Sequence, residues 1–335
     1  MAGILNNFRN QKTFMIGGTN VKKALLVGIN NYPDAPLSGC ISDAVELAKI
    51  LATNEDGSPN FSVRSITDDQ HQITKGSLRR NIKELFEDDN DVALLYFSGH
   101  GFVNAIGGYI VTPDYSNYDE GINMDEILTL ANNSPARNKV IILDCCHSGT
   151  FGNPTITGSD RTILGQNLTI LTACKSQQVA VEKEGQGLFT GLLIEALGGG
   201  AADLCGNATA GSVYWYVDKA LGPWDQRPVF KTNVSAYVPL RTMTPPIPLE
   251  LLRGLPLYFD SPSAEHRLDP SYEFMEKSAK PENVKVFKEL QKLESVGIVK
   301  PVGEEHMYFA AIHSQSCRLT ALGQCYWRFA VEGKI

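Results

Sequence analysis

Short apolar runs alternate along the first two thirds of the chain with stretches in which apolar residues recur at helical spacing. The runs have the length and the β-branched content of buried strands. They lie at Lys23–Ile29, Phe61–Ile66, Val92–Phe97, Val140–Leu143, Leu168–Cys174 and, beginning with Gln226, up to Phe230. Helical spacing is found after Gly39 up to Leu51, at Ser77–Phe86, Met124–Ala131, Leu188–Leu197 and Val213–Leu221, and Gly107–Val111 has the pattern of a short hairpin. This alternation predicts an α/β fold, a mainly parallel sheet flanked by helices on both faces.

Two of the predicted strands run out into polar, glycine-bearing turns that carry reactive side chains. The run from Val92 leads to His100, and the run from Val140 leads to Cys145 and Cys146. Ligands of open α/β sheets bind at the carboxyl ends of the strands, so the imidazole and a thiol are expected at one edge. There, the imidazole would take the thiol proton and the thiolate would attack a carbonyl carbon. The alternative is that the cysteines only pack as small apolar side chains.

The segments Ser98–Gly101 and Asp144–Gly149 resemble the paired signatures of the caspase-like cysteine peptidases, in particular the metacaspase and bacterial orthocaspase branch. The roughly 50 residues between histidine and cysteine also agree with this family. The resemblance covers about residues 20–240 and includes a stretch at Gly39–Ala44, where Ser42 replaces the usual asparagine. It implies that His100 is the base and Cys146 the nucleophile, with Cys145 packed into the sheet, although the sequence leaves the choice between the two thiols open.

The same resemblance implies a substrate pocket and an oxyanion hole. The pocket for the residue before the cut would be lined by Cys40, Asp43, Ser98 and Asp144. Two carboxylates attract a guanidinium or ammonium group and repel an acid, so arginine or lysine is expected at that position. Backbone N–H groups near Gly101 and Cys146 are the candidate oxyanion donors. The simpler interpretations are a helix N-terminal charge for Asp43 and a strand-end cap for Asp144.

Metal ions are considered in two places. Several metacaspases need Ca²⁺, and the candidate oxygen ligands here are Asp114, Asp119, Glu120, Asp125 and Glu126. Solvated surface acids are the simpler interpretation, and the segment after the cysteine has no acid before Asp160. A zinc site at His306, His313, Cys317 and Cys325 is not expected, because their spacing fits no zinc pattern.

Composition narrows the setting of the protein. The 335 residues, 43% of them hydrophobic, are enough for a substantial core and favour a division into two domains. The net charge of −7 argues against a general nucleic-acid surface. Seven cysteines without a C-x-x-C pair indicate a reducing compartment. The sequence shows neither the pattern of a signal peptide nor a long apolar span. A cytoplasmic location without membrane contact is therefore expected.

The chain is predicted to divide into an N-terminal extension (1–20), a caspase-like domain (21–241), a linker (242–280) and a winged-helix-like domain (281–335). The last domain is inferred from a helix beginning at Pro281, a hairpin that includes Ile298-Val299 and Met307–Ile312, and a final helix from Leu319. From Arg241 onward, twelve basic and twelve acidic residues cancel, so this domain is expected to bind a regulatory protein and not nucleic acid.

Two functions are therefore considered. The first is a cysteine endopeptidase that cuts protein or peptide substrates after arginine or lysine, is regulated through its C-terminal domain and, as the resemblance implies, belongs to a bacterial defence or cell-death system. The second is a catalytically silent caspase-like scaffold that binds and assembles proteins. The presence of both His100 and Cys146 favours the first. Arg161 is a candidate site of self-cleavage.

Overall fold

The computed structural model describes residues 21–70, 72–104, 107–116, 119–145, 164–173, 182–183, 186–221 and 227–335. Cys146 and Arg161, which were assigned roles above, lie outside these residues, as does the N-terminal extension.

A six-stranded sheet in the order β12-β8-β7-β3-β1-β2 forms the centre of the first lobe. Its strands are β1 (Lys22–Gly28), β2 (Phe61–Thr67), β3 (Val92–Ser98), β7 (Asn138–Asp144), β8 (Leu168–Thr172) and β12 (Val229–Asn233). All neighbours are parallel except β12, which runs antiparallel to β8. Every residue of β3 is buried, as its apolar run predicted. The predicted fold class is confirmed.

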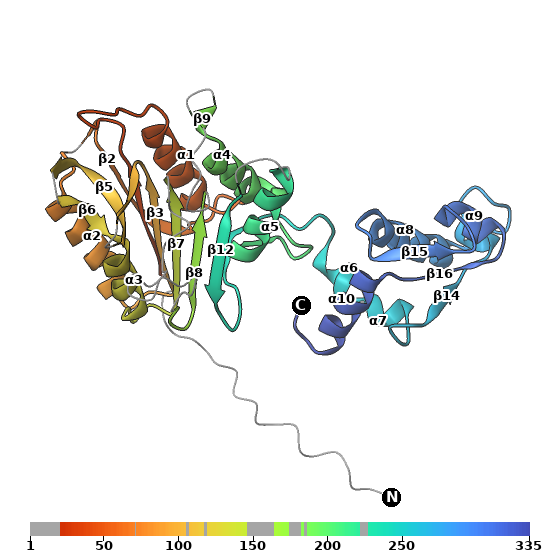
Figure 1. The fold of residues 1–335 in the computed structure, drawn as a ribbon. Coiled ribbons are helices and arrows are strands. Elements are labelled where there is room, and N and C mark those ends of the chain that lie inside the picture. The colour runs from red at the N-terminus through yellow and green to blue at the C-terminus, as the bar shows by residue number, and fades with distance from the viewer. Residues whose placement is uncertain are drawn as a thin grey trace, which may run out of the picture.

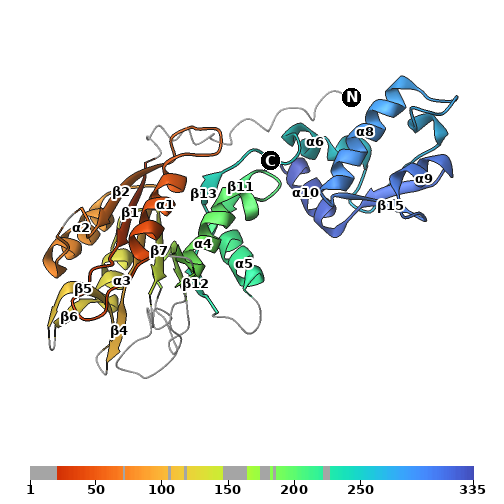
Figure 2. The same ribbon diagram turned by 90° about the horizontal axis from the view of Figure 1, so that it is seen from above.

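Helices cover both faces of this sheet (Figures 1 and 2). On one face lie α1 (Cys40–Ala52), α4 (Leu188–Glu195) with its π-helical continuation (Ala196–Gly200), and α5 (Ala210–Ala220). Their apolar side chains share a core with Tyr96 and Ile142 of the sheet. On the other face, α2 (Lys75–Glu87) and α3 (Met124–Asn132) pack around Phe97 and Leu143. Alternate residues of each strand therefore point to two separate cores. We call these the α1 face and the α2 face.

Smaller strands lie outside the central sheet. Directly after β3, the chain forms an antiparallel sheet of β4 (Gly101–Asn104), β5 (Gly107–Ser116) and β6 (Asp119–Asn123). The hairpin predicted at Gly107–Val111 is thus the first half of the longer strand β5. The pairs β9 (Glu182–Lys183) with β10 (Gln186–Gly187) and β11 (Asn207–Thr209) with β13 (Pro239–Thr242) are also antiparallel.

The C-terminal third has a core of its own. Its elements are α6 (Leu249–Arg253), α7 (Leu255–Tyr258), β14 (Glu265–Arg267), the 3-10 helix η3 (Pro270–Tyr272), α8 (Pro281–Ser295), β15 (Val299–Val302), α9 (Met307–Ile312), β16 (Ser316–Leu319) and α10 (Ala321–Val331). The three strands pair antiparallel in the order β14-β16-β15.

Two expectations for this region differ from the structure. Residues 307–312 form helix α9 and not a strand of the hairpin, because the buried Met307, Ala310 and Ala311 recur at helical spacing. The expected linker at 242–280 instead contributes Leu252, Leu255 and other apolar residues to the C-terminal core. The winged-helix-like arrangement stays a prediction.

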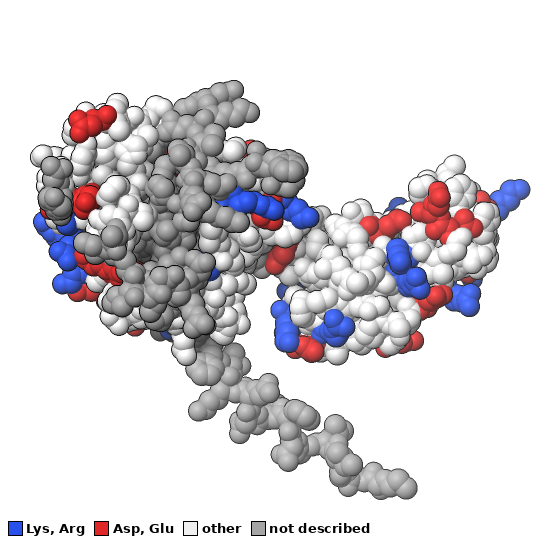
Figure 3. All heavy atoms as spheres, in the orientation of Figure 1, with Lys and Arg blue, Asp and Glu red and all other residues white. Residues whose placement is uncertain are grey.

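The surface of the C-terminal lobe carries both signs of charge. On the face shown in Figure 3, its lysines and arginines are interspersed with aspartates and glutamates. Among the residues that the structure describes, no helix has both the length and the apolar character needed to span a bilayer.

Candidate active site

The backbone of His100 is fixed by three neighbouring segments. Its N–H donates to the hydroxyl of Tyr32 at 3.0 Å, and its carbonyl accepts from the N–H of Val111 at 2.9 Å. The preceding Gly99 donates its N–H to the carbonyl of Asp144 at 3.4 Å. A Cβ at position 99 would lie 2.5 Å from the Tyr32 hydroxyl, so glycine is needed there for this close approach. The turn that carries the histidine is therefore held against β5, β7 and the β1–α1 loop.

The imidazole of His100 is oriented by the β1–α1 loop. Its Nε2 lies 2.7 Å from the carbonyl oxygen of Ala35, and its ring meets the edge of the Tyr32 ring with 4.5 Å between centroids. A carbonyl can only accept a hydrogen bond, so this contact places the proton on Nε2. Nδ1 is then the basic nitrogen of the neutral ring. The sequence suggested no such orienting partner, because a backbone carbonyl belongs to no particular residue type.

The end of β7 lies beside the end of β3. Ser98 and Asp144 are directly paired in the parallel register, so the chain leaves the two strands at neighbouring positions. Cys145 follows, is buried in the core of the α2 face and has no exposed surface. This confirms the packing predicted for Cys145. Cys146 lies outside the described residues.

Two buried carboxylates lie under this edge, on the α1 face. Asp43 on α1 and Asp144 at the end of β7 are 2% and 6% exposed. The N–H of Gly187 donates to Oδ1 and Oδ2 of Asp43 at 3.1 and 3.2 Å. A Cβ built on Gly187 would lie 2.7 Å from Oδ2 of Asp144 and 2.8 Å from Oδ2 of Asp43. Both carboxylates therefore reach the same point, which only a glycine leaves open.

A buried hydroxyl network supports these acids. Thr190 on α4 donates to Oδ2 of Asp144 at 2.6 Å, and its oxygen lies 2.7 Å from the hydroxyl of Tyr96. Since the single proton of Thr190 points to the carboxylate, Tyr96 donates to Thr190. The Ser98 hydroxyl donates to Oδ2 of Asp43 at 3.4 Å. Burial and, next, the charges of Asp144 and Asp43 raise the pKa of Tyr96 well above 10.0.

The predicted pocket residues are thus largely brought together. Asp43, Ser98 and Asp144 form one buried cluster, and Cys40 lies buried one turn before Asp43 at the start of α1. Tyr96, Thr190 and Gly187 belong to the same cluster but were not identified from the sequence. Tyr96 occupies an ordinary position in an apolar run, which gives no signal that its hydroxyl faces an acid.

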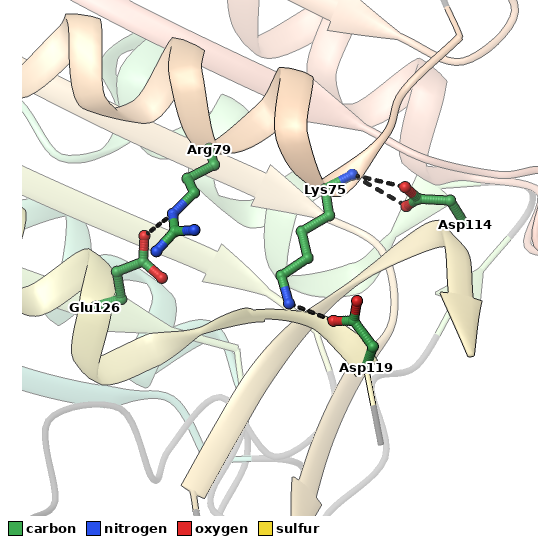
Figure 4. Close-up of polar contacts among 5 residues, drawn as sticks. All are labelled: Lys75, Arg79, Asp114, Asp119 and Glu126. Carbon is green, nitrogen blue, oxygen red and sulfur yellow. Dashed lines mark hydrogen bonds and ion pairs between the residues drawn. The ribbon is translucent and has the colours of Figure 1, made fainter. Parts of the chain in front are cut away.

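Three of the candidate calcium ligands have protein partners instead (Figure 4). Asp114 accepts the backbone N–H of Lys75 with both oxygens, at 3.0 and 3.1 Å. Asp119 pairs with the side chain of Lys75, and Glu126 pairs with Arg79. Across the part of the chain that the structure describes, no group of three or more acidic, histidine or cysteine residues is arranged to hold a metal ion. These acids fasten β5, β6 and α3 to helix α2.

A cleft of about 660 Å³ opens beside His100. The described residues that line it come from the β1–α1 loop, the turn after β3, and strands β4, β5 and β6. They are Tyr32, Ala35, His100, Gly101, Phe102, Val111, Tyr115, Ser116 and Glu120. Gly101, the predicted oxyanion residue, therefore lies at the wall of an open cleft.

Comparison with known proteins identifies a family for the first two thirds of the chain. A family model described as "Caspase domain" matches residues 21–236. Metacaspase-1B of Aspergillus fumigatus is 29% identical over 206 residues, which cover 54% of this chain and 48% of that protein. The human mucosa-associated lymphoid tissue lymphoma translocation protein 1 is 28% identical over 182 residues, covering 52% of this chain and 21% of that protein.

The solved structures add a likeness of fold. Protein GSU0716 from Geobacter sulfurreducens matches with a TM-score of 0.50 and 19% identity, over 67% of this chain and all of that one. The chain spans about half the length or less of the curated relatives described above.

Proposed function

We propose that this chain, which belongs to the caspase domain family, is a cysteine endopeptidase that cuts protein or peptide substrates after arginine or lysine. The family match confirms the predicted family, and it supports the proposed enzyme class, a cysteine-type endopeptidase. The observation that carries the proposed specificity is the buried pair of Asp43 and Asp144 beside the turn of His100.

The proposed reaction uses Cys146 as the nucleophile. Nδ1 of His100 takes the thiol proton, and the thiolate attacks the scissile carbonyl carbon. The C–N bond then breaks, and the imidazolium returns the proton to the leaving amine. Water, activated by the same imidazole, hydrolyses the thioester and releases the second product. Backbone N–H groups near Gly101 and Cys146 would stabilise the negative charge on the carbonyl oxygen. The Ala35 carbonyl supports this scheme, because it keeps the proton on Nε2 and leaves Nδ1 basic.

Specificity before the cut would come from the two carboxylates. A guanidinium group offers paired N–H donors that match carboxylate oxygens, and an ammonium group supplies the same charge. An aspartate in the substrate would meet like charges in a buried pocket, where a charge pair at about 4 Å and an effective dielectric constant near 20 costs about 4 kcal/mol. Gly187 would contribute by leaving the space between Asp43 and Asp144 open to a flat or slender group.

The setting of the enzyme is a further part of the proposal. The C-terminal lobe has its own core and would bind a regulatory protein. The proposed cytoplasmic location rests on the cysteine usage and the apolar pattern of the sequence, and a role in bacterial defence or cell death rests on the family resemblance alone. Asp114, Asp119 and Glu126 already have partners in the protein, so dependence of the activity on Ca²⁺ is tested by experiment.

The test is hydrolysis of fluorogenic peptides that end in arginine, lysine or aspartate, with and without Ca²⁺. Cleavage after arginine or lysine should disappear in Cys146→Ala and persist in the matched variant Cys145→Ala, whose thiol is buried. Cleavage after aspartate would overturn the proposed pocket. If no peptide is cut and a thiol-reactive arginine probe fails to label Cys146, the silent scaffold is the better description.

A further inference from the structure

We infer that the cleft beside His100 binds the substrate residues that follow the cut, and that it selects apolar and basic side chains there. The inference rests on the proposed function, because it assumes that a peptide is held across the edge of the sheet. It adds a second specificity site to the acid pocket, on the opposite face.

The two sites are separated by the sheet. Asp43 and Asp144 are joined through Thr190 to Tyr96, whose side chain belongs to the core of the α1 face. The cleft is bounded by Tyr32, which is buried in the core of the α2 face, and by Val111 and Tyr115, which pack against that core. A substrate whose residue before the cut enters the acid pocket would therefore leave the edge of the sheet toward the cleft.

The position of His100 supports this direction. A general acid must reach the nitrogen of the leaving amine, which belongs to the residue after the cut. His100 is itself a wall of the cleft. The segment that leaves with this amine is thus placed at the mouth of the cleft, whose volume of about 660 Å³ lies within the range of ligand-binding pockets.

The lining determines which side chains fit. Phe102, which lines the cleft, is 41% exposed and projects from β4 immediately beyond Gly101. Exposed apolar side chains next to a cleft offer a surface to an apolar group. The described lining residues include the carboxylate of Glu120 but no lysine or arginine. The cleft should therefore accept a basic side chain and disfavour an acidic one.

The wall that carries Tyr115 and Glu120 is anchored on two sides. The Tyr115 hydroxyl donates to Asp34 at 2.5 Å, which ties β5 to the β1–α1 loop. On the other side, Asp114 and Asp119 hold Lys75 of helix α2, as described above. The ends of β5 and β6 are thus fixed in the protein before a substrate arrives, and this lowers the entropic cost of binding.

The experiment compares two kinds of arginine substrate on the full chain. Internally quenched peptides carry variable residues after the cut, whereas an arginyl aminocoumarin amide carries none. For the wild type, peptides with leucine and lysine after the cut should be cleaved faster than those with aspartate. Phe102→Ala should lower kcat/KM for the leucine peptide about five- to tenfold, and Glu120→Gln should lower the lysine-over-aspartate preference about two- to fivefold. Hydrolysis of the amide, which has only the coumarin beyond the cut, should change less than cleavage of the corresponding peptide in either variant.

The controls are Phe274→Ala and Glu305→Gln, which remove an exposed phenylalanine and an exposed glutamate from the C-terminal lobe. They should leave both substrates unaffected. Equal rates for all quenched peptides, or equal losses with the amide, would overturn the inference while the proposed peptidase stands.

Binding of a fluorescent Leu-Lys peptide, measured by anisotropy, supplies a readout that needs no catalysis. Binding that is weakened by Phe102→Ala supports the cleft even if no peptide is cut, and absence of binding at millimolar peptide counts against it.

Discussion

Replacing Thr190 with valine should separate Tyr96 from Asp144 and weaken the acid pocket. The Thr190 hydroxyl, which is fully buried, donates to Asp144 at 2.6 Å and lies 2.7 Å from the Tyr96 hydroxyl. A hydrogen bond to a charged group contributes about 1.5–3 kcal/mol. Valine also removes the acceptor of a buried tyrosine hydroxyl, at a cost of about 1 kcal/mol or more. We expect the free energy of unfolding of the caspase domain to fall by about 3 kcal/mol.

The assay is urea unfolding of the full chain together with kcat/KM for an arginine substrate. Without the Thr190 hydroxyl, Asp144 is held less firmly, and kcat/KM should fall about tenfold, the equivalent of about 1.4 kcal/mol. The matched control is Thr169→Val, since the buried Thr169 hydroxyl lies 3.0 Å from Thr232 in the same sheet and away from the acids. It should cost about 1 kcal/mol in stability and leave kcat/KM unchanged.

A double-mutant cycle with Tyr96→Phe tests the reasoning directly. Tyr96→Phe alone should lower the free energy of unfolding by only about 1 kcal/mol, because it removes the hydroxyl itself and leaves no buried donor without a partner. In the Thr190→Val background it should cost nothing further, since it removes the hydroxyl that valine had stranded. Costs that simply add, or a Thr190→Val variant that is as stable as Thr169→Val, would refute the proposed network.

Three other outcomes are expected. Cys145→Ala should keep proteolytic activity and lose about 1–2 kcal/mol of stability through a small cavity, whereas Cys146→Ala should abolish activity. The folded-state pKa of Tyr96 is raised above 10.0, so its contribution to stability is complete below pH 10 and is lost as the pH rises beyond it. The free energy of unfolding, measured at pH 9–12, should therefore fall with rising pH in the wild type. Tyr96→Phe should make this fall less steep, by up to about 1.4 kcal/mol per pH unit. Gly187→Ala should lower kcat/KM for arginine substrates at least about tenfold, since the new methyl group would crowd both carboxylates. The control Gly76→Ala should leave kcat/KM unchanged, because a Cβ at that position meets nothing within 4 Å.

The edge of the sheet could be predicted because apolar runs determine it. β3 is buried throughout and β7 nearly so, and the polar turns after them fall where the strands end. Parallel strands place such turns at one edge, so the meeting of the His100 turn with Asp144 required no knowledge of side-chain contacts. The acids of the pocket followed from the family motifs.

The parts that escaped prediction depend on tertiary structure. The Ala35 carbonyl orients His100 only because the β1–α1 loop folds over it, and no residue type reports that conformation. Residues 307–312 have an apolar pattern short enough to fit a strand or a helix, and packing decided for the helix. Prolines near 245–248 suggested a linker, but the apolar residues that follow them, such as Leu252 and Leu255, complete a core.

The division of the site between two faces has a consequence for specificity. The acid pocket is anchored by α1 and α4, whereas the wall of the cleft is anchored by α2 through Lys75. These helices belong to different cores, so a change in one wall need not disturb the other. Strands β3 and β7 contribute side chains to both cores, and they also position His100 and Cys145. In the proposed peptidase, selection before and after the cut can therefore vary independently, while the ends of β3 and β7 stay fixed.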